Sequence, residues 1–209
     1  MELLWNHAVG AASATLILAH GAGAGMDSVV LEKLAQALAA RGFAVVRFEF
    51  PYMAARRLDG KRRPPDPQPR LLASWREVYA SVRQQVAGSV LLGGKSMGGR
   101  MASLLVDELG ADALVCFGYP FHPAGKPDKL RVEHLHGIHA PALIIQGERD
   151  ALGNRAEVEG YDLPSRIAMH WLAAADHDLK PLKSSGFSHE QHLQAAAYAV
   201  AAWVERIID

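Results

Sequence analysis

Short apolar segments alternate with longer stretches of helical spacing along this chain, and the alternation constrains the fold more than any other feature. Six apolar or β-branched runs bounded by glycine and proline are predicted to be strands: residues 15–19, 44–48, 89–92, 113–117, 142–146 and 167–172. Runs that are apolar throughout, such as residues 90–92 and 143–145, favour the middle of a parallel sheet. The sequence therefore predicts an α/β fold, a mostly parallel sheet with helices on both faces.

Apolar residues at helical spacing predict helices between most of these strands. The first helix is expected to begin near Asp27 or Ser28, either of which can cap it, and to end before Gly42. Three more are expected over residues 71–87, 96–110 and 188–207. Residues 119–141 are expected to be rich in loops, with one short helix near residues 129–135.

Size and charge set broad limits on function. The chain has 209 residues, of which 50% are apolar, enough for the core of a single domain over residues 1–209. Its 22 basic residues match its 22 acidic residues, so no overall field draws it to nucleic acid or to an anionic membrane. We therefore expect neither as a partner.

Three features of the sequence indicate a cytoplasmic protein. The one cysteine, Cys116, cannot form an internal disulfide, which is typical of a reducing compartment. The apolar stretch at residues 8–19 is interpreted as a strand, because a secretion signal needs a basic start and the first Lys or Arg is Lys33. No run reaches the ~18 apolar residues that a membrane-spanning helix requires.

A basic, proline-rich segment interrupts the pattern at residues 56–70. It holds six basic and two acidic residues, so its net charge is +4, although the chain as a whole is neutral. Its prolines argue against a helix or an inner strand between Pro51 and Arg70. We expect a solvated loop there, which could attract an acidic partner protein or an anionic substrate.

Two glycine-rich loops resemble nucleotide-binding motifs, but neither fits. The loop at residues 20–25 follows a strand and precedes a helix, and Glu49 could take ribose hydroxyls, yet Met26 stands where the dinucleotide fingerprint needs glycine. The loop at residues 93–96 ends like a phosphate-binding loop, yet Ser89 stands where that motif needs glycine.

The second loop fits a different motif. Residues 94–98 read Gly-Lys-Ser-Met-Gly, the G-x-S-x-G sequence, between a strand and a helix, where small flanking residues allow the sharp turn that projects Ser96. A serine nucleophile needs a base and an orienting acid, in the chain order serine, acid, histidine. Asp150 and His177 each follow a predicted strand. The carboxyl ends of parallel strands share one edge, so these three residues are predicted to form a catalytic triad.

Other residues compete for two of these roles. Asp176 and Asp178 flank His177 and are alternatives for the acid, although local salt bridging or capping is the simpler interpretation. His189 and His192 are alternatives for the base, but we expect them on the exposed face of the last helix.

The remaining parts of the predicted site are an oxyanion hole and an acyl pocket. The backbone amides of Met97, just after the nucleophile, and Ala22, in the first glycine loop, are expected to hold the oxyanion. Tyr119 and Phe121 end a strand at the active edge and could line the acyl pocket, with ordinary packing as an equal alternative.

Neither a metal nor a cofactor is expected. His134, His136 and His139 match no compact metal-binding motif. Cys116 lies in an apolar strand and is interpreted as a core residue. Lys95 is expected to point to solvent or to pair locally.

Four phrases carry a family resemblance: L-A-H-G-A-G, G-G-K-S-M-G-G-R, G-Y-P-F-H-P and G-E-R-D. From Leu18 to the final helix the sequence resembles the alpha/beta-hydrolase superfamily, most closely a small lidless branch similar to dienelactone hydrolases. That branch includes a regulatory subunit of the non-specific lethal acetyltransferase complex, and some of its members serve as scaffolds. Dienelactone hydrolases usually carry a cysteine nucleophile, whereas this chain has Ser96 at that place.

The sequence as a whole predicts a serine hydrolase that acts on a small ester or thioester by acyl transfer to water. The alternatives are a catalytically idle protein-interaction module on the same fold and, further away, a nicotinamide oxidoreductase. Residues 118–141 are too few and too rich in proline to build a helical lid. We therefore expect a shallow site that prefers short acyl chains, with a smaller preference for anionic esters.

Overall fold

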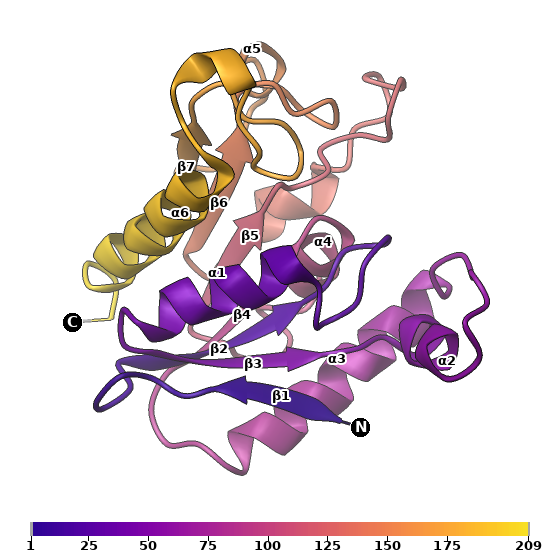
Figure 1. The fold of residues 1–209 in the computed structure, drawn as a ribbon, viewed down its shortest axis with the longest axis vertical. Helices are drawn as coiled ribbons and strands as arrows, with labels where there is room; N and C mark the ends of the chain where they lie inside the picture. The colour runs from indigo at the N-terminus through magenta and orange to yellow at the C-terminus, as the bar shows by residue number, and fades with distance from the viewer. Residues whose placement is uncertain (1, 209) are drawn as a thin grey trace.

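The computed structural model describes residues 2–208, in which seven strands form one sheet with helices on both faces (Figure 1). The strands are β1 (Leu3–Asn6), β2 (Ala14–Ala19), β3 (Phe43–Phe48), β4 (Val90–Lys95), β5 (Ala113–Phe117), β6 (Ala142–Gly147) and β7 (Ile167–Leu172). Their spatial order is β1-β3-β2-β4-β5-β6-β7. β1 runs antiparallel to β3, and every other neighbouring pair is parallel. The predicted α/β class is confirmed, and each of the six predicted strands is present.

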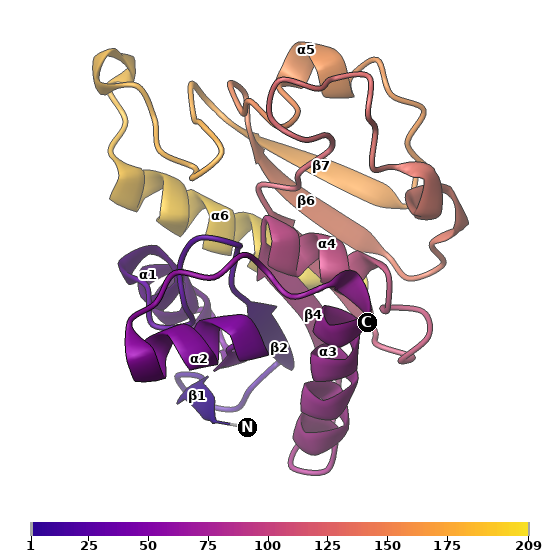
Figure 2. The same cartoon turned by 90° about the vertical axis from the view of Figure 1, so that its right-hand side faces the viewer.

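The helices divide between the two faces of the sheet (Figures 1 and 2). They are α1 (Val29–Ala39), α2 (Pro51–Asp59), α3 (Gln68–Arg83), α4 (Met97–Ser103), α5 (Arg155–Val158) and α6 (His189–Val204), with short 3-10 helices at Glu133–Gly137 and Lys183–Ser185. α1 and α6 pack together on one face, and α3 and α4 pack together on the other. No helix between residues 2 and 208 combines the length and hydropathy that crossing a bilayer requires.

The alternation of side chains along each strand explains why the central strands are apolar throughout. Successive residues of a strand point to opposite faces of the sheet. Ile17 and Leu92 belong to the core beneath α3 and α4, whereas their neighbours Leu16 and Leu91 belong to the core beneath α1 and α6. Because both faces are covered, neither side of these strands can carry polar residues at low cost.

β1 is the strand that the sequence did not predict. It has four half-buried residues at the edge of the sheet, too few to show a clear alternation. Pairing of Leu3 with Phe48 and a 2.9 Å hydrogen bond from Arg47 to Asn6 hold it to β3. Residues 8–13 precede β2 as a loop, so the predicted strand at residues 8–19 is correct only in its second half.

The expectation that residues 51–70 hold no helix is wrong, because α2 occupies Pro51–Asp59. Pro51 stands at the first helical position, where its missing N–H costs nothing. Gly60 ends the helix in the left-handed conformation, and the other prolines of the segment lie beyond it. Only residues 60–67 form the expected loop, and α3 begins at Gln68, earlier than predicted.

Two other expectations concern the segments around β5. The helix after Ser96 was expected to continue to Gly110, but α4 ends at Ser103 and tight turns follow it. Between β5 and β6 the only helical piece is Glu133–Gly137, close to the predicted short helix. This connection holds no lid domain, as predicted.

The contact between α3 and the sheet yields a test of the core. Trp75 of α3 is fully buried, and its ring meets Phe48 of β3 edge-to-face at a centroid distance of 4.9 Å. We expect Trp75→Ala to lower the free energy of unfolding by about 3–5 kcal/mol, because it leaves a large cavity. Tyr198→Ala on α6, where the side chain is 67% exposed, should change it by no more than about 0.5 kcal/mol. Urea denaturation measures both, and equal losses would contradict the packing described.

Candidate active site

Ser96 occupies a strained turn between β4 and α4. Its backbone has a φ of 51° and a ψ of −117°, a conformation that residues other than glycine rarely adopt. The turn reverses the chain between strand and helix, which places the serine hydroxyl at the carboxyl edge of the sheet. Strain of this kind persists where the surrounding structure enforces it.

Two glycines of the G-x-S-x-G motif make this turn possible. A Cβ on Gly94 would overlap the backbone of Gly98 and Gly99. A Cβ on Gly98 would lie 2.6 Å from the carbonyl oxygen of His20 and 2.7 Å from that of Ala19. The two small residues therefore let the turn close on itself and let α4 rest directly on the end of β2.

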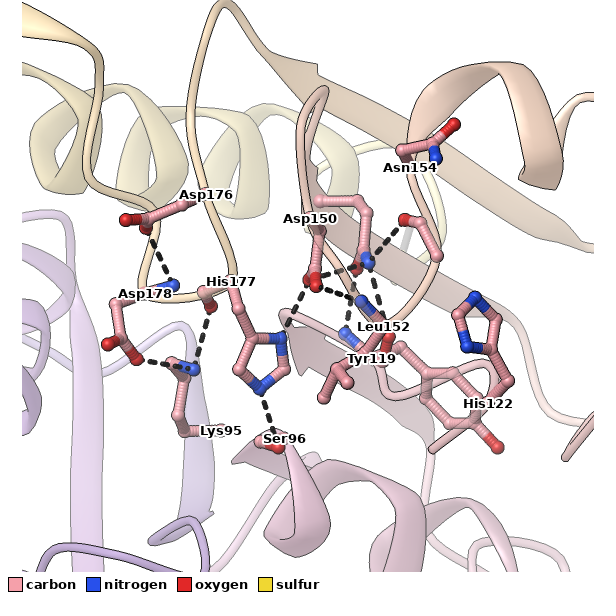
Figure 3. A network of polar contacts seen from close by, with 12 residues as sticks. Lys95, Ser96, Tyr119, His122, Asp150, Leu152, Asn154, Asp176, His177 and Asp178 are labelled. Atoms are coloured by element: carbon pink, nitrogen blue, oxygen red, sulfur yellow. Dashed lines mark hydrogen bonds and ion pairs between the residues drawn. The ribbon is translucent and has the colours of Figure 1, made fainter. Parts of the chain in front are cut away.

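The three residues of the predicted triad lie together (Figure 3). His177 Nε2 lies 2.8 Å from Ser96 Oγ, and His177 Nδ1 lies 2.7 Å from Asp150 Oδ2. Asp150 follows β6 and is fully buried, and His177 follows β7. The carboxylate can only accept, so Nδ1 carries the proton in the neutral imidazole, and the Nε2 lone pair faces the serine hydroxyl.

The competing acids have other partners. Asp176 accepts hydrogen bonds from the backbone N–H groups of Asp178 and Lys180, a local turn. Asp178 pairs with Lys95 at 3.1 Å. Burial raises the pKa of Asp178, but Lys95, with smaller contributions from His177 and His189, outweighs burial and leaves this pKa below its usual value. Asp176 therefore has the capping role that the simpler interpretation gave it, whereas the salt bridge of Asp178 reaches a residue distant along the chain.

The competing histidines also lie away from Ser96, and one expectation about them is wrong. His192 does not lie on the exposed face of α6 but is buried, with Nδ1 3.2 Å from the carbonyl oxygen of Leu179. It belongs to the buried face of α6 because it stands four residues before Ala196 and eight before Val200, both of which are buried. His189 is partly exposed and contacts the backbone carbonyl of Asp178 at 3.0 Å.

Lys95 does not point to solvent. Its side chain is only 12% exposed, and Nζ donates a 2.8 Å hydrogen bond to the backbone carbonyl of His177 while pairing with Asp178. This contact joins the end of β4 to the loop after β7, two segments 82 residues apart in the chain. Sequence reasoning missed it because the two partners are distant along the chain.

The side chains of His20 and Tyr52 hold the first glycine loop, residues 20–25, in place. The backbone N–H of Phe50 donates to His20 Nε2, so His20 Nδ1 carries the proton and donates to the carbonyl of Gly21 at 2.6 Å. Burial keeps the pKa of His20 below its ordinary value, which favours this neutral form. The hydroxyl of Tyr52 donates to the carbonyl of Ala22 at 3.1 Å. These bonds fix the loop by its carbonyl groups.

The two amides predicted for the oxyanion hole are free to donate. Within the described part of the chain, the N–H groups of Ala22 and Met97 have no protein acceptor. Ala22 borders the same cavity as Ser96, and Met97 is the first residue of α4. Backbone donors of this kind, fixed beside a nucleophile, can stabilise a developing negative charge.

A cavity of about 490 Å³ opens above Ser96. It lies between the first glycine loop and the start of α1 on one side and the triad on the other. Its lining consists of His20, Gly21, Ala22, Gly23, Ala24, Ser28, Val29, Val30, Leu31, Lys95, Ser96, His177 and Asp178. Most of these side chains are small or apolar, and the two charged ones, Lys95 and Asp178, pair with each other.

Tyr119 and Phe121 do not line this cavity, and ordinary packing, the equal alternative, describes both. Both side chains are fully buried in the core and contact each other at a ring-centroid distance of 4.9 Å. The Tyr119 hydroxyl donates to the carbonyl of Arg131 and so stays within the core. The start of α1 lines the cavity instead, through Val29 and Val30.

Glu49 and Lys95 belong to the segments that resemble nucleotide-binding motifs, and both side chains have other partners. Glu49 is buried, its carboxylate accepts from the backbone N–H of Met26, and it pairs with Arg57 at 2.6 Å. The Lys95 ammonium is held by Asp178. Neither side chain is therefore free to bind a ribose or a phosphate.

The histidines considered for a metal lie apart from the site. His134 Nε2 contacts Ser103 Oγ at 2.8 Å, and burial, with help from Arg100, lowers the pKa of His134 to about 4. Residues 2–208 contain no group of three or more His, Cys, Asp or Glu side chains that could hold a metal ion. Cys116 is fully buried in β5, and burial raises the pKa of its thiol.

Comparison with known proteins supports the family that the four sequence motifs resemble. The sequence model of the alpha/beta hydrolase domain family matches residues 12–205. The chain belongs to this family. The fold also resembles three solved structures, each less than 25% identical in sequence. The predicted membership of the alpha/beta-hydrolase superfamily is confirmed, and the likeness to these structures shows that the fold is shared.

The first of these is an alpha/beta serine hydrolase without a lid from Xanthomonas campestris, with a TM-score of 0.73 and 21% identity over 99% of this chain and 88% of that chain. The esterase domain of a Rhodothermus marinus protein has a TM-score of 0.70 and 17% identity over 98% and 92%. Dienelactone hydrolase from Anabaena variabilis has a TM-score of 0.69 and 22% identity over 100% and 94%.

The close approach at Gly98 yields a prediction for this hydrolase fold. Gly98→Ala should lower the free energy of unfolding by about 1–3 kcal/mol, because the new methyl group meets two backbone carbonyls that cannot rotate away. Gly137→Ala is the matched control, since its Cβ would have no neighbour within 4 Å. Urea denaturation compares the two, and a Gly98→Ala protein as stable as the control would refute the tight packing of the turn.

Proposed function

We propose that the protein is a serine hydrolase that cleaves small esters or thioesters by acyl transfer to water. The observation that carries this proposal is the hydrogen-bond chain from buried Asp150 through His177 to Ser96, beneath a cavity large enough for a small substrate. Membership of the alpha/beta hydrolase family supports hydrolysis as the reaction class. The triad assignment and the substrate class are inferences from the site geometry.

The first half of the proposed cycle transfers the acyl group to the enzyme. Ser96 Oγ attacks the carbonyl carbon of the substrate while its proton passes to His177 Nε2, and the carbonyl electron pair moves onto oxygen. The amides of Ala22 and Met97 stabilise that oxyanion, and Asp150 stabilises the imidazolium. When the tetrahedral intermediate collapses, the bond to the alcohol or thiol breaks, and this leaving group takes the proton from His177.

The second half returns the enzyme to its starting state. A water molecule gives its proton to His177 Nε2 as its oxygen attacks the acyl carbon. The resulting oxyanion occupies the same two amides. Collapse then releases the carboxylic acid, and the proton returns from His177 to Ser96 Oγ.

The cavity favours small acyl groups without charge. Ala22, Ala24 and Val30 present short apolar side chains, and no lid domain extends the cavity over the sheet edge. The Lys95 charge is already neutralised by Asp178, so it offers little to an anionic substrate.

The basic segment borders the site but is partly neutralised. Arg56 Nη1 contacts the carbonyl of Gly23 at 3.3 Å, beside the cavity. Three other arginines of the segment pair with carboxylates, as Arg57 with Glu49 and Asp27, Arg63 with Asp59, and Arg70 with Asp66. Any attraction of this segment for an anionic ester or an acidic protein partner therefore comes mainly from its arginine and lysine side chains that do not pair with a carboxylate.

The proposal is tested by labelling the purified protein with a fluorophosphonate probe, which reacts only with an activated serine. We expect rapid labelling of the wild-type protein and none of Ser96→Ala, because the probe forms its bond to Ser96 Oγ. Ser103→Ala is the control, since its hydroxyl bonds Arg100 and His134 away from the triad. Labelling that survives in Ser96→Ala would refute the nucleophile. A folded wild-type protein that does not label would favour the interaction module.

The absence of a lid yields a second expectation. Across p-nitrophenyl esters of increasing acyl length, kcat/KM should be highest for the shortest chains, because no lid domain covers the cavity and a long chain would extend from it into water. A rate that climbs from acetate to palmitate would contradict this cavity as the acyl site. Any preference for anionic esters should weaken as salt increases, since exposed charges are screened.

A further inference from the structure

We propose that Gln146 is a positioning residue that holds the Asp150 carboxylate in the orientation that His177 needs. This inference rests on the proposed function. Gln146 is fully buried near the end of β6, four residues before Asp150. It touches no part of the substrate cavity, so it can act on the reaction only through Asp150.

The amide of Gln146 has one orientation that satisfies its neighbours. Oε1 accepts the backbone N–H of Tyr119 at 2.7 Å. Nε2 donates to Asp150 Oδ2 at 2.9 Å and also faces the carbonyls of Tyr119 and Gly153, each at 3.1 Å. Rotating the amide by half a turn would set its NH₂ group against the Tyr119 N–H and its oxygen against three acceptors. The hydrogen-bond network therefore fixes which end faces Asp150.

This contact determines how the carboxylate is presented to the histidine. Asp150 Oδ1 accepts the backbone N–H of Leu152 at 2.8 Å, and Oδ2 accepts from both Gln146 and His177. A buried carboxylate is stable only when donors compensate for the loss of water. The donors on both oxygens prevent the group from rotating, so Oδ2 stays directed at His177 Nδ1 (Figure 3).

The same amide joins two loops that the chain does not connect directly. Tyr119 follows β5, whereas Asp150 and Gly153 follow β6. One side chain thus sets the spacing between these loops at the edge of the sheet. If Gln146 were purely structural, joining these loops would be its whole role. The pH dependence of a suitable variant separates this role from the positioning of Asp150.

Few ionisable groups face Gln146, which makes that pH dependence interpretable. Asp150 is in contact, and His177 lies on the far side of that carboxylate. From the neighbouring strand and loop, the Cys116 thiol has a pKa raised by burial and the Tyr119 hydroxyl is bonded to Arg131. His122 is engaged with Glu157 at 3.4 Å.

Gln146→Glu distinguishes a donor to Asp150 from a filler of space. A protonated glutamic acid can accept the Tyr119 N–H with one oxygen and donate to Asp150 with the other, as glutamine does. An ionised glutamate cannot donate and would repel Asp150. Burial and the Asp150 charge both oppose loss of this proton, so the neutral form should persist above the pH at which an exposed glutamate ionises.

The experiment measures kcat and KM for p-nitrophenyl acetate as a function of pH in four proteins: wild type, Gln146→Met, Gln146→Glu and the control Val82→Ala. Gln146→Met keeps the volume but removes the donor, and we expect kcat to fall about 100-fold with KM little changed. Gln146→Glu should approach wild-type activity at the acid end of the profile and lose it as pH rises. Val82→Ala removes core contacts in α3, away from the site, and should keep the wild-type profile despite lower stability.

Two results would overturn the inference: wild-type kcat in Gln146→Met, or a Gln146→Glu profile with the same shape as the wild type. NMR of the His177 Nδ1 proton, which resonates far downfield when bonded to a carboxylate, gives a readout independent of turnover. If the wild type hydrolyses no ester but Gln146→Met shifts or removes this signal, the proposed function fails and the positioning role stands. If the wild type is active and neither rate nor signal responds to Gln146→Met, only the positioning role fails.

Discussion

The candidate site depends on the direct contact between the start of α4 and the end of β2. Gly98 lies against the carbonyl groups of Ala19 and His20, at a separation that no side chain would allow. This contact fixes Ser96 in its unusual backbone conformation and sets α4 beside the first glycine loop. The two amides proposed to stabilise an oxyanion come from these two segments, so their spacing follows from the same contact. A small change in backbone packing would therefore alter the proposed nucleophile and these amides together.

Asp150 and His177 are held by a second set of contacts, on the other half of the sheet. The Asp150 carboxylate is fully buried, and three donors compensate for its desolvation. The loop that carries His177 is tied to β4 by Lys95, which reaches both the His177 carbonyl and the Asp178 carboxylate. The site is thus assembled from loops after β2, β4, β6 and β7, and side-chain hydrogen bonds between these loops set its geometry.

The position of the cavity shows how neighbouring packing determines which groups a substrate can meet. The loop after β5 ends at the active edge, yet its aromatic residues turn inward because Tyr119 finds acceptors in the core and Phe121 packs against it. The space above Ser96 is left open on the opposite side, where α1 begins. A substrate would therefore meet the small side chains of the glycine loop and the valines of α1 rather than aromatic rings.

The sequence by itself determined the α/β class, six of the strands and the residues of the candidate triad. Strand periodicity and the G-x-S-x-G turn are local, and the carboxyl ends of parallel strands share one edge whatever packs around them. Tertiary structure alone decided the edge strand β1, the burial of Tyr119 and Phe121, and the contacts of Lys95 and Gln146. These depend on which distant segments meet, and a side chain's partner in space leaves no periodic signal in the chain. Hence the sequence identified the candidate reactive groups, and only the fold revealed what holds them and which side of them is open.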